Sequence, residues 1–156
     1  MGPAGEAFVL QQGEGRSIEL GVFRMTVKAS SEETDGIFSL LEAAEPPGFG
    51  PPLHIHHDAA EAFYVLEGED LMFLGELEVS CAAGSFVFIP AGMHHSFRVG
   101  GVPSRKLNFY FPAAMIGYFD ELSEAIRDDD VDESRLADLA RRHSMEIVGA
   151  VPEGYV

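Results

Sequence analysis

The chain has 156 residues, of which 26 are acidic and ten are basic, and its formal net charge is −16 at pH 7. This charge repels phosphate groups, and the few basic residues form no cluster, so we expect neither nucleic acid nor a membrane as a partner. A lone cysteine excludes an internal disulfide, and no apolar run approaches the length of a membrane span. We therefore expect one cytoplasmic domain, spanning residues 1–156, that acts on a small molecule.

The first third of the chain carries the signals of β-strands. Residues 1–15 are rich in glycine and polar side chains, which indicates a loose tail or an edge strand around residues 8–10. Apolar and β-branched residues recur over 18–28 and 37–41, which predicts two strands, the first with a bend at Gly21.

The segment HIHHDAAEAFYVL carries two imidazoles and a carboxylate at a spacing that suits a metal site. Alternate side chains of a strand share a face, so His54 and His56 direct their imidazoles to one point. Four residues then suffice for a tight connection, after which Glu61 opens the apolar strand AFYVL. We expect this carboxylate to join the two imidazoles.

A third imidazole comes from farther along the chain. After a hairpin over 71–79 and a buried strand over 85–89, Pro90 and Gly92 signal a turn, and the chain enters a new strand at His95. The histidines next to the predicted ligands, His57 and His94, fall on the opposite strand faces. A shift of one residue in register would exchange His94 for His95.

Other residues on the strands are candidates for a pocket wall beside the metal. Alternation places Phe63 and Val65 on the face of Glu61, and Phe97 on the face of His95, so the cavity is expected to be aromatic and apolar. Asp70, at the head of a strand, and Asn108 and Tyr110, in a last strand over 106–111, are further candidates, although the sequence does not assign their strand faces.

Beyond Pro112 the apolar period changes from two residues to that of a helix. Met115, Phe119, Leu122 and Ile126 share one helical face. A second stripe follows Asp130, with Glu133 as its expected capping-box partner. We expect two short helices packed on the outside of a sheet. The alternative is a lid over the mouth of the barrel, contributed by Met115, Tyr118 or Phe119. An edge strand is expected over 145–148.

The metal-binding segments resemble the two motifs of the cupin superfamily. The first motif is matched by Gly48, His54, His56, Glu61 and Gly68, and the second by Gly84, Pro90, Gly92 and His95, all at the spacing of the family. One position departs from the second motif, since Val99 stands where cupins commonly have asparagine. The resemblance implies an all-β fold, the double-stranded β-helix or jelly-roll barrel, with its core over residues 17–112 and a helical extension over 113–145. It also implies one metal ion in the lumen, and a homodimer.

The ligand set leaves the reaction open. Three imidazoles and a carboxylate suit one divalent transition metal ion, Fe, Mn, Ni, Co or Zn, with positions left for water, oxygen or a chelating substrate. The short barrel with a helical extension resembles bacterial quercetin-dioxygenase-like cupins, and we expect a metal-dependent dioxygenase acting on a planar enol or aromatic substrate, with Glu61 as the catalytic residue that takes a proton. An oxygen-independent polyketide cyclase or isomerase is the first alternative. A cupin that binds metal or a small ligand without turnover is the second.

Overall fold

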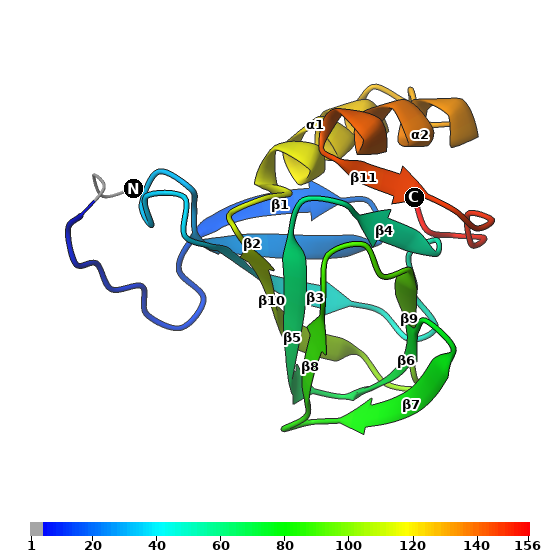
Figure 1. The fold of residues 1–156 in the computed structure, drawn as a ribbon, viewed down its shortest axis with the longest axis horizontal. Coiled ribbons are helices and arrows are strands. Elements are labelled where there is room, and N and C mark those ends of the chain that lie inside the picture. Colours follow the sequence, from blue (N-terminus) through cyan, green and yellow to red (C-terminus); the bar gives the residue numbers. More distant parts are fainter. Residues whose placement is uncertain (1–4) are drawn as a thin grey trace.

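Two antiparallel sheets face each other and enclose an apolar core, as seen in the computed structural model, which describes residues 5–156 (Figure 1). In spatial order the first sheet consists of β1 (Arg16–Leu20), β2 (Phe23–Ala29), β3 (Ser39–Glu45), β10 (Ser104–Phe111), β5 (Ala60–Glu67) and β8 (Phe86–Ile89). The second consists of β11 (Met145–Ile147), β4 (His54–His56), β9 (His95–Val99), β6 (Glu69–Leu74) and β7 (Leu77–Ala82). This arrangement confirms the predicted jelly-roll.

Burial follows the two-residue period of the strands. In β3 the buried side chains alternate with half-buried ones, and β10 shows the same alternation up to its last residue. Inward side chains from both sheets, among them Leu41, Val65 and Met72, are fully buried. The period therefore fixes which side chains of each strand reach the lumen.

The structure corrects the bounds of two expected strands and decides one open alternative. Residues 18–28 do not form one bent strand, because the chain reverses at Gly21 (φ 70°) and pairs β1 with β2 as a hairpin. The second strand begins and ends later than 37–41, so that it reaches Glu45. No strand forms around residues 8–10, whose side chains are exposed; residues 1–4 lie outside the described residues.

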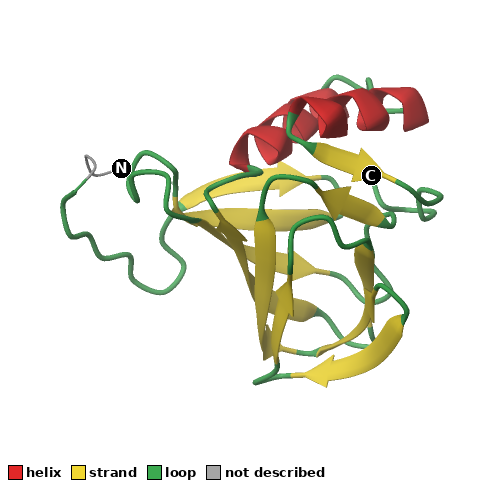
Figure 2. Ribbon diagram, in the orientation of Figure 1, coloured by secondary structure: helices red, strands yellow, loops and turns green. Residues whose placement is uncertain are grey.

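Two helices form a layer above β1 and β11 (Figure 2). The first, α1 (Ile116–Arg127), buries Tyr118, Phe119, Leu122 and Ala125, and the second, α2 (Glu133–Arg142), buries Leu136, Leu139 and Ala140. The expected capping box is wrong, because the N-cap of α2 is Asp132, whose carboxylate accepts from the Arg135 backbone N–H at 2.7 Å. The helices therefore bury the predicted apolar stripes, although the second one begins later than its signals suggested.

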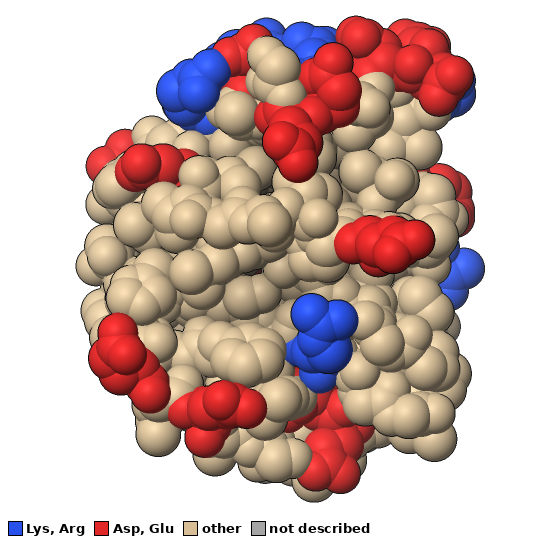
Figure 3. Space-filling model, turned by 90° about the vertical axis from the view of Figure 1, so that its right-hand side faces the viewer, with Lys and Arg blue, Asp and Glu red and all other residues tan. Residues whose placement is uncertain are grey.

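Acidic side chains are more widespread than basic ones on the face shown in Figure 3, and charged side chains are sparse across its middle. Within residues 5–156, no helix is long and apolar enough to cross a membrane.

Candidate metal centre

Three strands bring four potential ligands together. In β4 the side chains of His54 and His56 are buried, while Ile55 between them is only half-buried. Antiparallel pairing of β4 with β9 sets His54 opposite His95. Glu61 comes from β5 of the other sheet, and the ligand atoms of all four residues lie within 4.8 Å of one another. The cluster therefore bridges the two sheets from inside the barrel.

Hydrogen bonds to the backbone fix two of the imidazoles. The Nδ1 atom of His54 lies 2.7 Å from the carbonyl oxygen of Pro52, and that of His95 lies 3.0 Å from the carbonyl oxygen of Met93. An Nδ1–H that donates to a carbonyl leaves Nε2 as the ligand atom. The Nε2 atoms of His95 and His56 lie 2.8 and 3.5 Å from the same carboxylate oxygen of Glu61.

Burial and mutual proximity set the charge states of the cluster. Burial, together with the neighbouring imidazoles of His95 and His56, lowers the pKa of His54 to about 3. Burial favours the neutral form of Glu61, but the imidazoles of His56 and His95 outweigh it and hold the pKa of this carboxyl well below its usual range. Burial also opposes protonation of His95, whereas the hydrogen bond to Glu61 raises its pKa. His54 is thus a neutral imidazole and Glu61 a carboxylate at neutral pH, the states in which both bind metals.

The neighbouring histidines lie elsewhere. His57 is exposed, and its Nε2 lies 2.9 Å from the carboxylate of Glu146. His94 is half-buried outside the cluster, and its backbone carbonyl accepts from Gly75. His95, and not His94, is the histidine of the second segment that faces Glu61.

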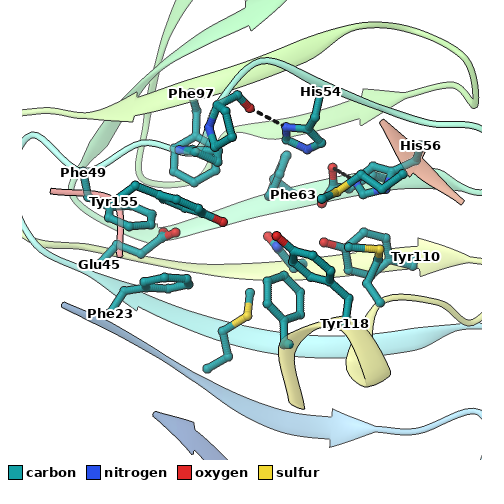
Figure 4. A pocket seen from close by; sticks show the side chains of 18 residues that line it. Phe23, Glu45, Phe49, His54, His56, Phe63, Phe97, Tyr110, Tyr118 and Tyr155 are labelled. Carbon is teal, nitrogen blue, oxygen red and sulfur yellow. Dashed lines mark hydrogen bonds and ion pairs between the residues drawn. The ribbon is translucent and has the colours of Figure 1, made fainter. Parts of the chain in front are cut away.

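A cavity with a volume of about 50 Å³ adjoins the cluster. Four of the predicted pocket residues line it, namely Phe63, Phe97, Asn108 and Tyr110 (Figure 4). The other two do not. Val65 lies on the inward face of β5, where it is fully buried in the core, and the Asp70 carboxylate is buried against Lys106 at 3.0 Å.

The wall of the cavity is polar near Glu61. The Tyr110 hydroxyl lies beside the Glu61 carboxylate, and burial together with this negative charge raises the pKa of Tyr110 well above its usual value. The side-chain oxygen of Asn108 is buried and has no hydrogen-bond partner among the described residues. The polar side chains of Asn108 and Tyr110, both on β10, thus line the same cavity as Glu61.

Several lining residues were not predicted from the sequence. Glu45, at the end of β3, is buried and forms an ion pair with Lys106, whose Nζ atom also lies 4.0 Å from the centre of the Phe97 ring. Alternation along β3 would have placed Glu45 inward, had the strand been extended to that residue. Tyr155 also lines the cavity, but it lies in an irregular segment that carries no periodic signal.

The expectation that the helices pack plainly on the outside of a sheet is wrong for α1. Met115, Tyr118 and Phe119 line the cavity, which agrees with the alternative of a lid. The amphipathic stripe predicted that α1 would dock, but it did not decide whether the docked face would line the cavity.

Comparison with known proteins agrees with this geometry. The cupin domain family matches residues 42–106. A quercetin 2,3-dioxygenase of Bacillus subtilis is 28% identical over 117 residues, and an uncharacterised protein of Methanocaldococcus jannaschii is 35% identical over 75 residues. These alignments cover 75% and 47% of this chain, which spans only 35% and 60% of the length of the two relatives.

A solved structure with high coverage is the Streptomyces protein Pac13 with uridine, a nucleoside dehydratase. It aligns over 95% of both chains with a TM-score of 0.62 at 12% identity, which shows a common fold. Taken with the two motifs and the inward-facing cluster of three histidines and a glutamate, these matches identify a cupin domain over residues 42–106 and support a small protein of the cupin superfamily.

Proposed function

We propose that the chain is a metal-dependent enzyme acting on a small planar enol or aromatic molecule, and that its reaction is a dioxygenation of the quercetinase type. The observation that carries the proposal is the cluster of His54, His56, Glu61 and His95, which adjoins a cavity lined by aromatic side chains. The similarity to the Bacillus dioxygenase over 117 residues supports the choice of reaction.

The residues of the cluster fit a divalent transition metal ion. A carboxylate and imidazoles that converge within 4.8 Å, two of them oriented by backbone carbonyls, form the donor set typical of Fe, Mn, Ni, Co or Zn sites. When bound, such an ion supplies Lewis acidity and open coordination positions for substrate oxygens.

The side chains of this chain would then bind, orient and deprotonate the substrate. Glu61 is ionised and faces the cavity, so it accepts the proton of an enolic hydroxyl held at the cluster. Tyr110 lies beside that carboxylate and orients it. Phe63 and Phe97 form apolar walls that exclude water from the reacting groups.

Two other functions use the same residues. The four ligands serve an oxygen-independent cyclase or isomerase as well, because the Lewis acid and the Glu61 base are what an enolisation needs. A cupin that binds metal or ligand without turnover needs the cluster but not the basicity of Glu61.

The test follows oxygen uptake and product mass when the metal-loaded protein is incubated with flavonols and aromatic polyketides, with and without oxygen. A gain of two oxygen atoms that is abolished anaerobically supports the dioxygenase. A product of unchanged mass, or one lighter by a water, formed without oxygen supports the cyclase or isomerase. Ligands that bind but never change, and that bind equally well to Glu61→Gln, would overturn both; His57→Ala serves as the control for a histidine outside the cluster.

We also propose that two copies of the chain form a homodimer through the outer face of the first sheet. Aromatic side chains gather there on β5, β8 and β10, and Tyr64, Phe86, Phe88 and Phe111 are each at least 41% exposed. The register pairs Tyr64 with Phe86 across β5 and β8. An apolar sheet face of this kind is stabilised when a second copy covers it.

A further inference from the structure

We propose that the aromatic end of the cavity is a binding subsite for a phenolic ring, which the side chain of Tyr155 occupies in this structure. The inference deepens the proposed function and rests on it for the link to catalysis. Its structural part, the subsite and its closure by Tyr155, rests on contacts within the chain.

Tyr155 lies in an aromatic cage that matches a phenol. Its ring stacks on Phe23, with centroids 5.9 Å apart and an angle of 25°, and lies 5.7 Å from the ring of Phe49. Its hydroxyl lies beside that of Tyr118, and burial, this neighbouring hydroxyl and the Glu45 carboxylate together raise the pKa of Tyr155 well above its usual value. Figure 4 shows the Tyr155 hydroxyl pointing toward the middle of the cavity. The cage thus binds both the faces and the hydroxyl of a phenol.

Tyr155 is the one buried side chain of residues 149–156, and the half-buried Val151 also packs against the core. The last backbone hydrogen bond to the barrel runs from the N–H of Val148 to the carbonyl of Leu53 at 2.9 Å. Within residues 149–156, the Tyr155 N–H donates a backbone hydrogen bond to the Pro152 carbonyl of the same segment. This bond closes a turn in which Gly154 adopts φ 77°. Among the described residues, no backbone bond ties 149–156 to a strand, so the ring can leave without opening a sheet.

The size of the cavity requires that the ring leaves before a substrate enters. The volume of about 50 Å³ beside the cluster holds an ion and a few waters. An apolar cavity that accommodates a single benzene ring measures about 150 Å³. A planar aromatic substrate therefore fits only when Tyr155 moves out, and the space that it leaves has the shape and polarity of a phenol.

An independent observation indicates that a hydrogen-bond donor belongs in the same cavity. The side-chain oxygen of Asn108, a residue only 5% exposed, lines the cavity and has no partner among the described residues. Buried acceptors are normally paired, so this oxygen marks the place of a donor on the ligand. Glu45 and Glu61 disfavour an anionic ligand in the same space. A neutral aromatic ring with a hydroxyl group offers a donor to the Asn108 oxygen and carries no charge that Glu45 and Glu61 would repel.

The test uses p-cresol, which is the side chain of tyrosine, and toluene, which lacks the hydroxyl. Tyr155→Ala should bind p-cresol about tenfold more tightly than the unchanged protein does, because the competing ring is gone, and it should bind toluene more weakly than p-cresol. Tyr155→Phe keeps the ring and should gain nothing, and Val22→Ala, at a position 52% exposed outside both the cavity and the proposed dimer face, serves as the control. Equal affinity of Tyr155→Ala and unchanged protein, or equal binding of toluene and p-cresol, would overturn the assignment.

A second measurement needs no substitution. If p-cresol and Tyr155 compete for one site, millimolar p-cresol should speed amide hydrogen exchange over residues 149–156 of the unchanged protein, about threefold or more. Exchange that stays constant across the titration contradicts the competition. Both measurements are made without metal and without turnover, so failure of the proposed reaction leaves their expected results unchanged.

Discussion

At the scale of single residues, Lys106 holds together the buried charges of the barrel. Its fully buried ammonium pairs with Glu45 and lies 3.0 Å from Asp70. Burial raises the pKa of Glu45, and the charge of Lys106 counters this effect. Without the lysine, two carboxylates would remain buried with no cation beside them, which is far less favourable than keeping the whole group.

We therefore expect Lys106→Met to lower the free energy of unfolding by about 3–5 kcal/mol at neutral pH, measured by urea denaturation. The loss should shrink as the pH falls, because the stranded carboxylates then take up protons. Arg105→Met is the matched control on the outer face of β10, where the ion pairs with Glu42 and Glu67 are partly exposed and contribute about 1 kcal/mol or less. Equal losses for the two variants would show that the buried pair is not what stabilises this part of the barrel.

At the scale of elements, the glycines of the first motif differ in what they do for the fold. Both adopt the left-handed region, Gly48 with φ 77° and Gly68 with φ 83°. A Cβ on Gly48 would meet nothing within 4 Å, whereas one on Gly68 would lie 2.6 Å from the Pro103 carbonyl oxygen. Gly48→Ala should destabilise the protein by about 1–2 kcal/mol through backbone strain alone. Gly68→Ala should destabilise it more, because the backbone at Pro103 must also move; thermal unfolding that ranks the two in the opposite order contradicts this reading.

The elements also show how far the sequence predicts the structure. The two-residue period of β4 and the spacing of both motifs were enough to predict that His54, His56, Glu61 and His95 meet. A helical stripe says only that one face of α1 is covered, so it could not decide between outside packing and a lid in which Tyr118 lines the cavity. Tyr155 was not predicted for a different reason. It reaches the lumen from an irregular segment, and only tertiary contacts with Phe23 and Phe49 place it there.

At the scale of the whole molecule, the outer face of the first sheet determines the expected assembly. We expect light scattering at micromolar concentration to give twice the 16.9 kDa mass of one chain. Phe88→Asp places a charge in the aromatic face and should shift the protein toward a monomer without unfolding it, because this side chain is 56% exposed. Deletion of residues 1–15 should weaken the dimer only if the edge strand β1 belongs to the contact. A monomer for the unchanged protein would contradict the proposed interface.

The central claim is that the inward-facing cluster binds one metal ion. Elemental analysis after loading with a divalent transition metal tests it most directly, on the unchanged protein and on five histidine variants. We predict about one ion per chain, a large loss of metal in His54→Ala, His56→Ala and His95→Ala, and no comparable loss in His57→Ala or His94→Ala, whose side chains lie outside the cluster. A protein that retains no metal, or one in which His94→Ala empties the site while His95→Ala does not, would contradict the account.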